Sequence, residues 1–260
     1  MILRILFIGD IMGRPGRECL KTAIPGLDSN YRMDVIIANG ENSAGGWGIT
    51  QKVAREIFDA GVDVITGGNH IWDNKDVFNF IDQEERLLRP LNYPPGTPGR
   101  GSVVFEKAGR KIGVICLAGQ VFMPEIECPF RKSVGEIERL KRETPIIIVD
   151  FHAEATSEKN AMGWFLNDKA SAVIGTHTHV QTADERIIGQ QMGYITDVGM
   201  TGPFNSVIGV NIDQAIEKFT TKLPVRFRLG DAQPAQLNAL FLEVDNEGIC
   251  TYLERINMVI

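Results

Sequence analysis

The stretch Gly175-Thr176-His177-Thr178-His179 follows directly on Ala172-Val173-Ile174, a short apolar run that is typical of the end of a buried strand. Residues two apart in an extended segment point to the same side, so His177 and His179 are expected to face one point in space. Two converging neutral imidazoles suit a transition metal such as Zn, Fe, Cu or Ni. The competing interpretation is a pair of polar histidines in a surface loop.

The other two of the four histidines occupy similar places in the sequence. His152 follows the apolar run 146–151, and His70 follows the run 62–66 through Gly67-Gly68-Asn69. Every histidine therefore comes just after a strand-like run, and none lies inside an expected helix. This shared position favours one common site over scattered loop histidines.

The composition predicts an ordinary globular α/β protein. The chain has 260 residues, of which 43% are hydrophobic and 23% charged, and its net charge is −6. No Lys/Arg block stands out, so extended DNA or RNA binding is not expected. A small phosphate-containing ligand is compatible with this negative net charge, because bound cations can supply the positive charge that a phosphate needs. With no linker-like composition and no internal repeat, one domain over residues 1–260 is the expectation.

The cysteines and the N-terminus indicate a cytoplasmic protein. Four scattered cysteines without a C-x-x-C pair are typical of buried free thiols in a chain of this length. The N-terminal segment 1–10 is apolar but runs into an Asp with no cleavage-type site, so it predicts a first strand and not a signal peptide. No apolar run approaches the roughly 20 residues that span a bilayer, and no membrane association is expected.

Hydrophobic periodicity and turn residues predict alternating strands and helices. A helix opened by Pro15 is expected to close at Pro25-Gly26, and a second is expected to be capped by Thr50 and stopped at Gly61. The loop 45–48 is glycine-rich but lacks the G-K-[ST] of a phosphate-binding loop. The remaining helices are expected at 74–81, 133–142, 157–165 and 213–219, and the strands at 2–8, 34–38, 62–66, 102–106, 111–117, 146–150, 172–175, 192–196, 225–229, 236–245 and 249–259.

Polar side chains with metal-binding chemistry follow these strands. They are Asp10, Glu41, Asn42, Asn69, His70, His152, His177, His179 and Asp197. Ligands of open α/β sheets bind beyond the carboxyl ends of the strands, so these side chains are expected to meet there. One metal needs three or four protein ligands, and this set is enough for two, which can clamp a phosphoryl group and activate water. Mixed Asp, Glu, Asn and His ligation without Cys favours Fe, Mn or Zn.

Several of these motifs resemble the calcineurin-like metallophosphoesterases. They are Gly9-Asp10, Gly67-Gly68-Asn69-His70, His152 and the stretch 175–179. The resemblance implies a four-layer αββα sandwich of two mixed β-sheets flanked by helices, with a two-metal site. Two motifs depart from the superfamily pattern, because D-x-H is Asp10-Ile11-Met12 here and G-D-x-x-D is Gly40-Glu41-Asn42.

Both departures match the YmdB-like branch, which the chain resembles nearly end to end. The matching segments are 9–13, 39–42, 68–73, 150–158, 175–184 and 196–203. The likeness implies a cytoplasmic phosphodiesterase that acts on 2′,3′-cyclic nucleotides with iron or manganese, zinc being an acceptable replacement, and it leaves a homo-oligomer open. It also implies residue roles: Asp10, Asn42 and His179 on the first metal, Asn69, His152 and His177 on the second, Glu41 as the bridge and His70 as the proton donor.

Several interpretations stay open at this stage. Asp150 and Asp197 are each expected either to orient a ligating histidine or to cap a turn, and Asp73 either to pair with His70 or to cap a helix. Trp47, Trp72 and Phe122 either stack on a base or serve packing. Two alternatives to the phosphodiesterase are a phosphomonoesterase on the same metals and a regulatory protein that retains the site.

Overall fold

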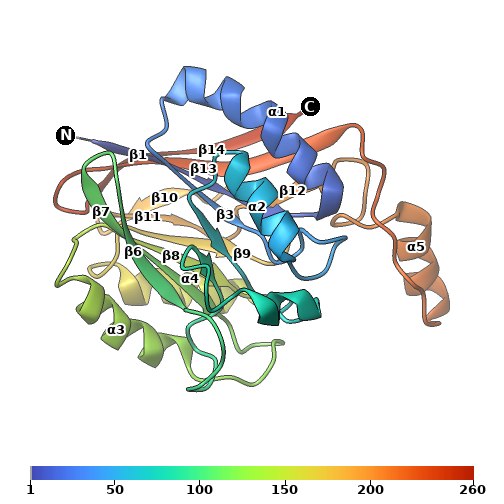
Figure 1. Cartoon of the computed structure of the whole chain (residues 1–260), viewed down its shortest axis with the longest axis horizontal. Helices are drawn as coiled ribbons and strands as arrows, with labels where there is room; N and C mark the ends of the chain where they lie inside the picture. The colour runs from blue at the N-terminus through green and yellow to red at the C-terminus, as the bar shows by residue number, and fades with distance from the viewer. Residues whose placement is uncertain (1) are drawn as a thin grey trace.

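The computed structural model describes residues 2–260, which form two mixed β-sheets stacked face to face (Figure 1). The eight-stranded sheet has the order β2-β12-β13-β1-β3-β4-β5, with β14 beside β13. The six-stranded sheet has the order β10-β11-β9-β8-β7-β6. The strands of the first sheet are β1 (Leu3–Ile8), β2 (Asp10–Ile11), β3 (Val35–Asn39), β4 (Val64–Thr66), β5 (Leu87–Leu88), β12 (Met200–Pro203), β13 (Ala235–Val244) and β14 (Cys250–Val259). Those of the second are β6 (Ser102–Lys107), β7 (Arg110–Ala118), β8 (Ile147–His152), β9 (Ala172–Thr176), β10 (Arg186–Ile188) and β11 (Met192–Ile195).

Each sheet has a parallel centre and antiparallel additions. Strands β1, β3, β4 and β5 run parallel, and the long β13–β14 hairpin adds antiparallel to β1. In the six-stranded sheet, β7, β8, β9 and β11 run parallel, with β6 and β10 antiparallel at the edges. Parallel strands present their carboxyl ends at one edge, which is where ligands of α/β sheets bind.

Alternating side chains of β1 explain how the layers pack. Leu6 and Ile8 lie in a buried cluster with the helices α1 (Gly13–Tyr31) and α2 (Gln51–Asp59), whereas Ile5 and Phe7 lie in a second cluster with strands of the six-stranded sheet. Successive residues of a strand point to opposite faces, so one apolar strand serves both interfaces. The eight-stranded sheet is thus covered by helices on one face and by the other sheet on its inner face.

The outer face of the six-stranded sheet is covered by α3 (Pro129–Leu140) and α4 (Thr156–Leu166). Their side chains Ile137 and Met162 are buried in a third cluster with Val149 and Phe151 of β8. The layers therefore follow the order helix, sheet, sheet, helix, which confirms the predicted αββα sandwich. Helix α5 (Ile212–Thr221) lies away from these layers in Figure 1. Within residues 2–260 we find no helix with the length and apolar character needed to cross a bilayer.

The predicted end of the first helix is wrong. Helix α1 continues through Pro25 to Tyr31. Proline removes one backbone donor, but its neighbour Ile24 and the later Leu27 are buried against the sheet. Burial of this apolar face keeps the helix continuous, and Arg32 in a left-handed conformation ends it.

Other local predictions also differ from the structure. The segment 74–81 contains a short 3₁₀ helix, η1 (Lys75–Asn79), and Phe78 is exposed although Val77 and Ile81 are buried. The segment 225–229 is not a strand and has only an isolated bridge between Leu229 and Val210. The short strands β2, β5, β10 and β12 were not predicted, because two to four residues carry little periodicity.

Candidate metal centre

Oxygen-bearing side chains lie at the carboxyl edge of the eight-stranded sheet. Asp10 comes two residues after β1 and opens β2, Glu41 and Asn42 follow β3, and Asn69 follows β4. Asp10, Glu41 and Asn42 are buried and Asn69 is partly buried. The parallel strand order brings these residues together, although up to 59 positions separate them in the sequence.

The three histidines come from the corresponding edge of the six-stranded sheet. His152 ends β8, and the turn after β9 carries His177 and His179. Both residues of the turn have a left-handed backbone, with φ of 101° at His177 and 64° at His179. Such a conformation costs a non-glycine residue on the order of 1–3 kcal/mol and persists only where surrounding contacts hold it. The extended geometry predicted for this stretch therefore ends at Thr176.

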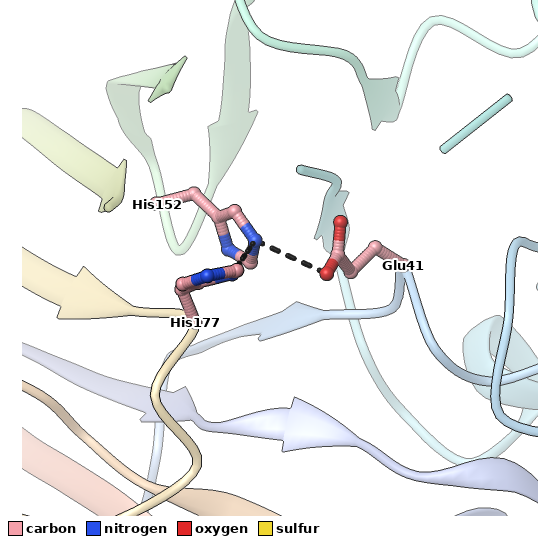
Figure 2. A group of neighbouring side chains, drawn as sticks. All are labelled: Glu41, His152 and His177. Atoms are coloured by element: carbon pink, nitrogen blue, oxygen red, sulfur yellow. Dashed lines mark hydrogen bonds and ion pairs between the residues drawn. The ribbon is translucent and has the colours of Figure 1, made fainter. Parts of the chain in front are cut away.

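One group of donor atoms surrounds the Nε2 atom of His152. This atom lies 3.0 Å from His177 Nδ1, 3.0 Å from Asn69 Oδ1 and 3.1 Å from Glu41 Oε1. Figure 2 shows Glu41, His152 and His177 pointing toward one another from three separate segments. Donors at right angles on a cation with bonds of about 2.1 Å lie about 3 Å apart, so these spacings fit a transition metal.

A second group lies around Asp10. Its Oδ1 atom is 3.6 Å from His179 Nε2, and His179 Nε2 is 3.3 Å from the Asn42 carboxamide. A cation would take the amide oxygen of Asn42, which a half-turn of the carboxamide brings to the same place. Glu41 Oε1 lies 3.1 Å from both Asn42 Nδ2 and His152 Nε2, so one carboxylate oxygen touches both groups.

The buried carboxylates of the cluster, Asp10 and Glu41, need a positive charge nearby to offset their own. The Asp10 Oδ1 atom is buried without a hydrogen-bond partner. Burial lowers the pKa of the His152 imidazole, but the charge and hydrogen bond of Glu41 outweigh this and raise it to about 9. Burial also opposes ionisation of Asp10, yet the neighbouring His179 holds the pKa of that carboxyl well below its usual range. A proton on imidazole thus fills the role that a cation would take.

His177 has the opposite environment. Burial and the neighbouring His152 lower the pKa of the His177 imidazole to about 3. Its ring is therefore neutral at pH 7 and suited to bind a metal through Nδ1. The Nε2 atom faces the Glu154 carboxylate at 3.1 Å, as expected for a carboxylate that orients a ligating histidine.

Gly68 leaves the space in which the donors meet. A Cβ at this position would lie 2.3 Å from Glu41 Oε2 and 2.3 Å from His152 Nε2. Real Cβ atoms do not approach other atoms so closely, so only glycine allows the two side chains their present positions. The residues present therefore fit a metal centre in geometry, in charge and in donor chemistry.

Asp150 acts on His152 through a threonine. The buried Asp150 carboxylate accepts from Thr176 Oγ1 at 2.7 Å, and this hydroxyl lies 2.9 Å from His152 Nδ1. Asn39 Nδ2 also donates to Asp150, at 3.1 Å. Burial raises the pKa of the Asp150 carboxyl to about 6. Of the two interpretations left open for Asp150, the structure favours orientation of a histidine over a turn cap.

His70 lies beside the cluster without its ring joining either group of donors. Its backbone N–H donates to Glu41 Oε2 at 2.8 Å, and its ring Nδ1 pairs with Asp73 Oδ2 at 2.8 Å. Asp73 therefore pairs with His70, and the helix cap is Asn74, whose side chain accepts from the Asp76 N–H.

The three aromatic residues singled out in the sequence differ in exposure. Trp72 stacks on Phe78 with ring centroids 5.2 Å apart, so one of its faces serves packing. Phe122 is 89% exposed, and Trp47 is 37% exposed. Neither has an aromatic stacking partner among the described residues.

Some contacts around the cluster were not anticipated from the sequence. Asn39, Glu154, Thr176 and Lys159 had no expected role. Glu154 lies two positions after His152, outside strand β8. The alternation of side chains along a strand therefore does not predict which histidine Glu154 contacts. Proximity in the sequence to a predicted ligand could have identified Asn39, Glu154 and Thr176. Lys159 lies farther from any predicted ligand, so this criterion would have missed it.

The chain matches known proteins over almost its whole length. The family model described as YmdB-like protein matches residues 6–256. A 2′,3′-cyclic-nucleotide 2′-phosphodiesterase of Bacillus subtilis is 46% identical over 245 residues, covering 94% of this chain and 92% of that protein. The solved structure of a novel phosphatase from Mycoplasma pneumoniae has a TM-score of 0.93 and 39% identity, covering 100% of this chain and 94% of that one.

A more distant likeness supports the fold alone. A putative 5′-nucleotidase from Staphylococcus aureus has a TM-score of 0.63 at 16% identity and covers 100% of this chain and 54% of that chain. The two stacked sheets and the His, carboxylate and amide donors at their shared edge define a metallophosphoesterase-type hydrolase. Within that class, the chain belongs to the YmdB-like family.

Proposed function

We propose that this chain hydrolyses 2′,3′-cyclic nucleotides or related small phosphodiesters with the help of two transition-metal cations, iron or manganese. The observation that carries the proposal is the position of Glu41 Oε1, 3.1 Å from both Asn42 Nδ2 and His152 Nε2. A single carboxylate between two groups of ligands is the arrangement expected of a bridged pair of cations. The Bacillus subtilis relative, with its named activity on cyclic nucleotides, supports the substrate class.

The ligands divide into two sets in this proposal. Asn69, His152 and His177 would hold one cation, Asp10, Asn42 and His179 the other, and Glu41 would contact both. When bound, the cations would supply Lewis-acid stabilisation of the phosphoryl oxygens and an activated water. The chain contributes the rest by orienting the ligands through Glu154, Asp150 and Thr176.

His70 would donate the proton that the leaving ribose oxygen needs. Asp73 engages Nδ1 at 2.8 Å and fixes the ring, so Nε2 is the nitrogen that can face a substrate. The side chain is 33% exposed, so the ring is accessible from solvent. A positioned general acid of this kind typically contributes ~10²–10⁴-fold to the rate.

A cavity lies next to the cluster on the side of His179. A cavity of about 320 Å³ adjoins His179 and is lined by Phe204, Gln181, Asn238 and Asn257 among others. Small-molecule sites of this size combine an apolar wall with a few polar groups. Of the candidate ligands, His179 is the one that lines this cavity, so a small molecule bound there would lie beside the second group of donors.

A cytoplasmic location is part of the same proposal. All four cysteines are free thiols, and Cys19, Cys116 and Cys250 are buried. Free buried thiols are typical of proteins in reducing compartments.

The test is metal analysis of anaerobically purified protein together with a panel of substrates. We expect about two transition-metal ions per chain and faster turnover of 2′,3′-cyclic nucleotides than of aryl phosphate monoesters. One ion or none after full reconstitution would contradict the two-cation site. Faster turnover of the monoester would favour a phosphatase, and two bound ions without turnover of any phosphate ester would favour a regulatory protein.

A further inference from the structure

Asp197 occupies the point where the chain crosses from one sheet to the other. It lies between β11 of the six-stranded sheet and β12 of the eight-stranded sheet, and its side chain is 1% exposed. A buried carboxylate needs several donors to offset the loss of water. The partners of Asp197 come from three different segments.

The Asp197 carboxylate accepts four hydrogen bonds from the described residues. Its Oδ2 atom accepts from Lys159 Nζ at 2.6 Å, from the Thr178 N–H at 3.0 Å and from Thr178 Oγ1 at 2.7 Å. Its Oδ1 atom accepts from the Gly199 N–H at 2.8 Å. The carboxylate therefore holds the turn after β9 and the start of β12 at once.

The turn after β9 carries two candidate ligands, and the residue before β12 contacts a third. Thr178 lies between His177 and His179, whose left-handed backbone needs external contacts to persist. The carbonyl oxygen of Gly199 accepts from the Asp10 N–H at 3.0 Å. One carboxylate is thus linked to two histidines of one sheet and to an aspartate of the other.

Lys159 completes this arrangement from helix α4. Its side chain is 1% exposed, and its ammonium makes a buried ion pair with Asp197. Buried ion pairs add little net stability relative to apolar side chains of similar size, because both charges lose their hydration. Stability alone therefore does not account for the pair, whereas a need to fix the geometry of its neighbours does.

We propose that Asp197 and Lys159 form a positioning pair that fixes His177 and His179 relative to Asp10 across the junction of the two sheets. The inference rests on the proposed cation site, because its consequence is the spacing of ligands from the two sheets. The pair touches neither substrate nor cation and acts through Thr178 and Gly199.

The experiment is a titration of the metal-free protein with Mn²⁺ by calorimetry. Asp197→Asn places an amide where Oδ2 now accepts three bonds, and the affinity should fall about 10–100-fold, as for other groups that orient metal ligands. Thr178→Ala removes only the hydroxyl bond and should give a smaller loss, near the lower end of that range. Lys159→Met removes the ammonium that pairs with the buried Asp197 carboxylate, so the carboxylate should shift from its present position. Mn²⁺ binding should therefore weaken as it does in Asp197→Asn.

Thermal unfolding of the metal-free variants separates positioning from general destabilisation. Leu140→Ala is the matched control, since Leu140 is buried in the outer cluster on α3, and it should lower the melting temperature while leaving the Mn²⁺ affinity unchanged. Thr178→Ala should lower the Mn²⁺ affinity while leaving the melting temperature nearly unchanged. Unchanged Mn²⁺ affinity in both Thr178→Ala and Asp197→Asn would overturn the positioning role. Failure of the wild-type chain to bind Mn²⁺ would instead contradict the proposed function.

Discussion

The two sheets contribute different chemistry to the same site. The edge of the eight-stranded sheet supplies oxygen donors from Asp10, Glu41, Asn42 and Asn69, whereas that of the six-stranded sheet supplies imidazole nitrogen from His152, His177 and His179. The oxygen donors follow ordinary strand ends, but two of the histidines sit in a left-handed turn that other residues hold in place. The first sheet thus supplies carboxylate and amide oxygens, and the second supplies imidazole nitrogens, two of which depend on supporting contacts for their positions.

This contrast predicts that the two edges fail in different ways. Loss of a carboxylate should remove the attraction for cations, whereas loss of a support behind a histidine should alter geometry at nearly constant charge. Substitutions on each edge can therefore separate charge from position.

Gly68→Ala should have the largest effect, because its Cβ would meet candidate ligands of both edges. The new atom would lie 2.3 Å from Glu41 Oε2 and 2.3 Å from His152 Nε2. We expect loss of measurable metal binding and of activity, checked by metal analysis and phosphodiester turnover. Gly135→Ala is the control, since nothing lies within 4 Å of its added Cβ. Normal metal content in Gly68→Ala would mean that the two edges do not meet there.

Glu41→Gln should be the next most damaging change, because it removes the charge that faces both ligand groups. A unit charge about 4 Å from a cation at an effective dielectric of 20 is worth about 4 kcal/mol per unit of cation charge. Because Mn²⁺ is divalent, cation affinity should fall by at least ~10³-fold, with loss of most activity, as measured by Mn²⁺ titration. Wild-type turnover with two bound ions would show that Glu41 is not the bridge.

His70→Asn should lower turnover of a cyclic nucleotide by ~10²–10⁴-fold while metal content stays at the wild-type value. His70 lies at the oxygen edge, but its ring faces Asp73 and not the ligand groups. The loss should shrink on a nitrophenyl diester, whose leaving group needs little protonation. Equal losses on both substrates would argue against a general acid, and loss of metal would make His70 a ligand.

Asn42→Ala should have the smallest effect of the four. It removes one neutral donor of the oxygen edge, and the carboxylates Asp10 and Glu41 remain. We expect roughly a tenfold loss of Mn²⁺ affinity, at the low end of the range for groups that tune a metal site. A loss as large as that of Glu41→Gln would show that ligand number matters more than charge at this edge.

The sequence by itself determined most of the strands and the set of candidate ligands, whereas the order of the four layers was expected from the resemblance to the calcineurin-like metallophosphoesterases. Apolar runs such as Leu3–Ile8 identify strands covered on both faces, and the polar residue after each run is expected at the carboxyl edge of its sheet. These rules concern neighbours in the chain, so they can be applied without coordinates. They select the residues that the structure brings together, whereas the metal-binding and catalytic roles of those residues stay predictions.

Only the tertiary structure decided how these residues are grouped and supported. The backbone at His177 and His179 is left-handed, which the sequence pattern does not predict. Two contacts, Glu154 with His177 and Lys159 with Asp197, connect segments that no local sequence pattern relates. Tertiary packing likewise carries α1 through Pro25, because burial of Ile24 and Leu27 outweighs the lost backbone bond. Strand periodicity reports which face a side chain occupies, but contacts between distant segments depend on how the two sheets stack, and that is set by the packed core as a whole.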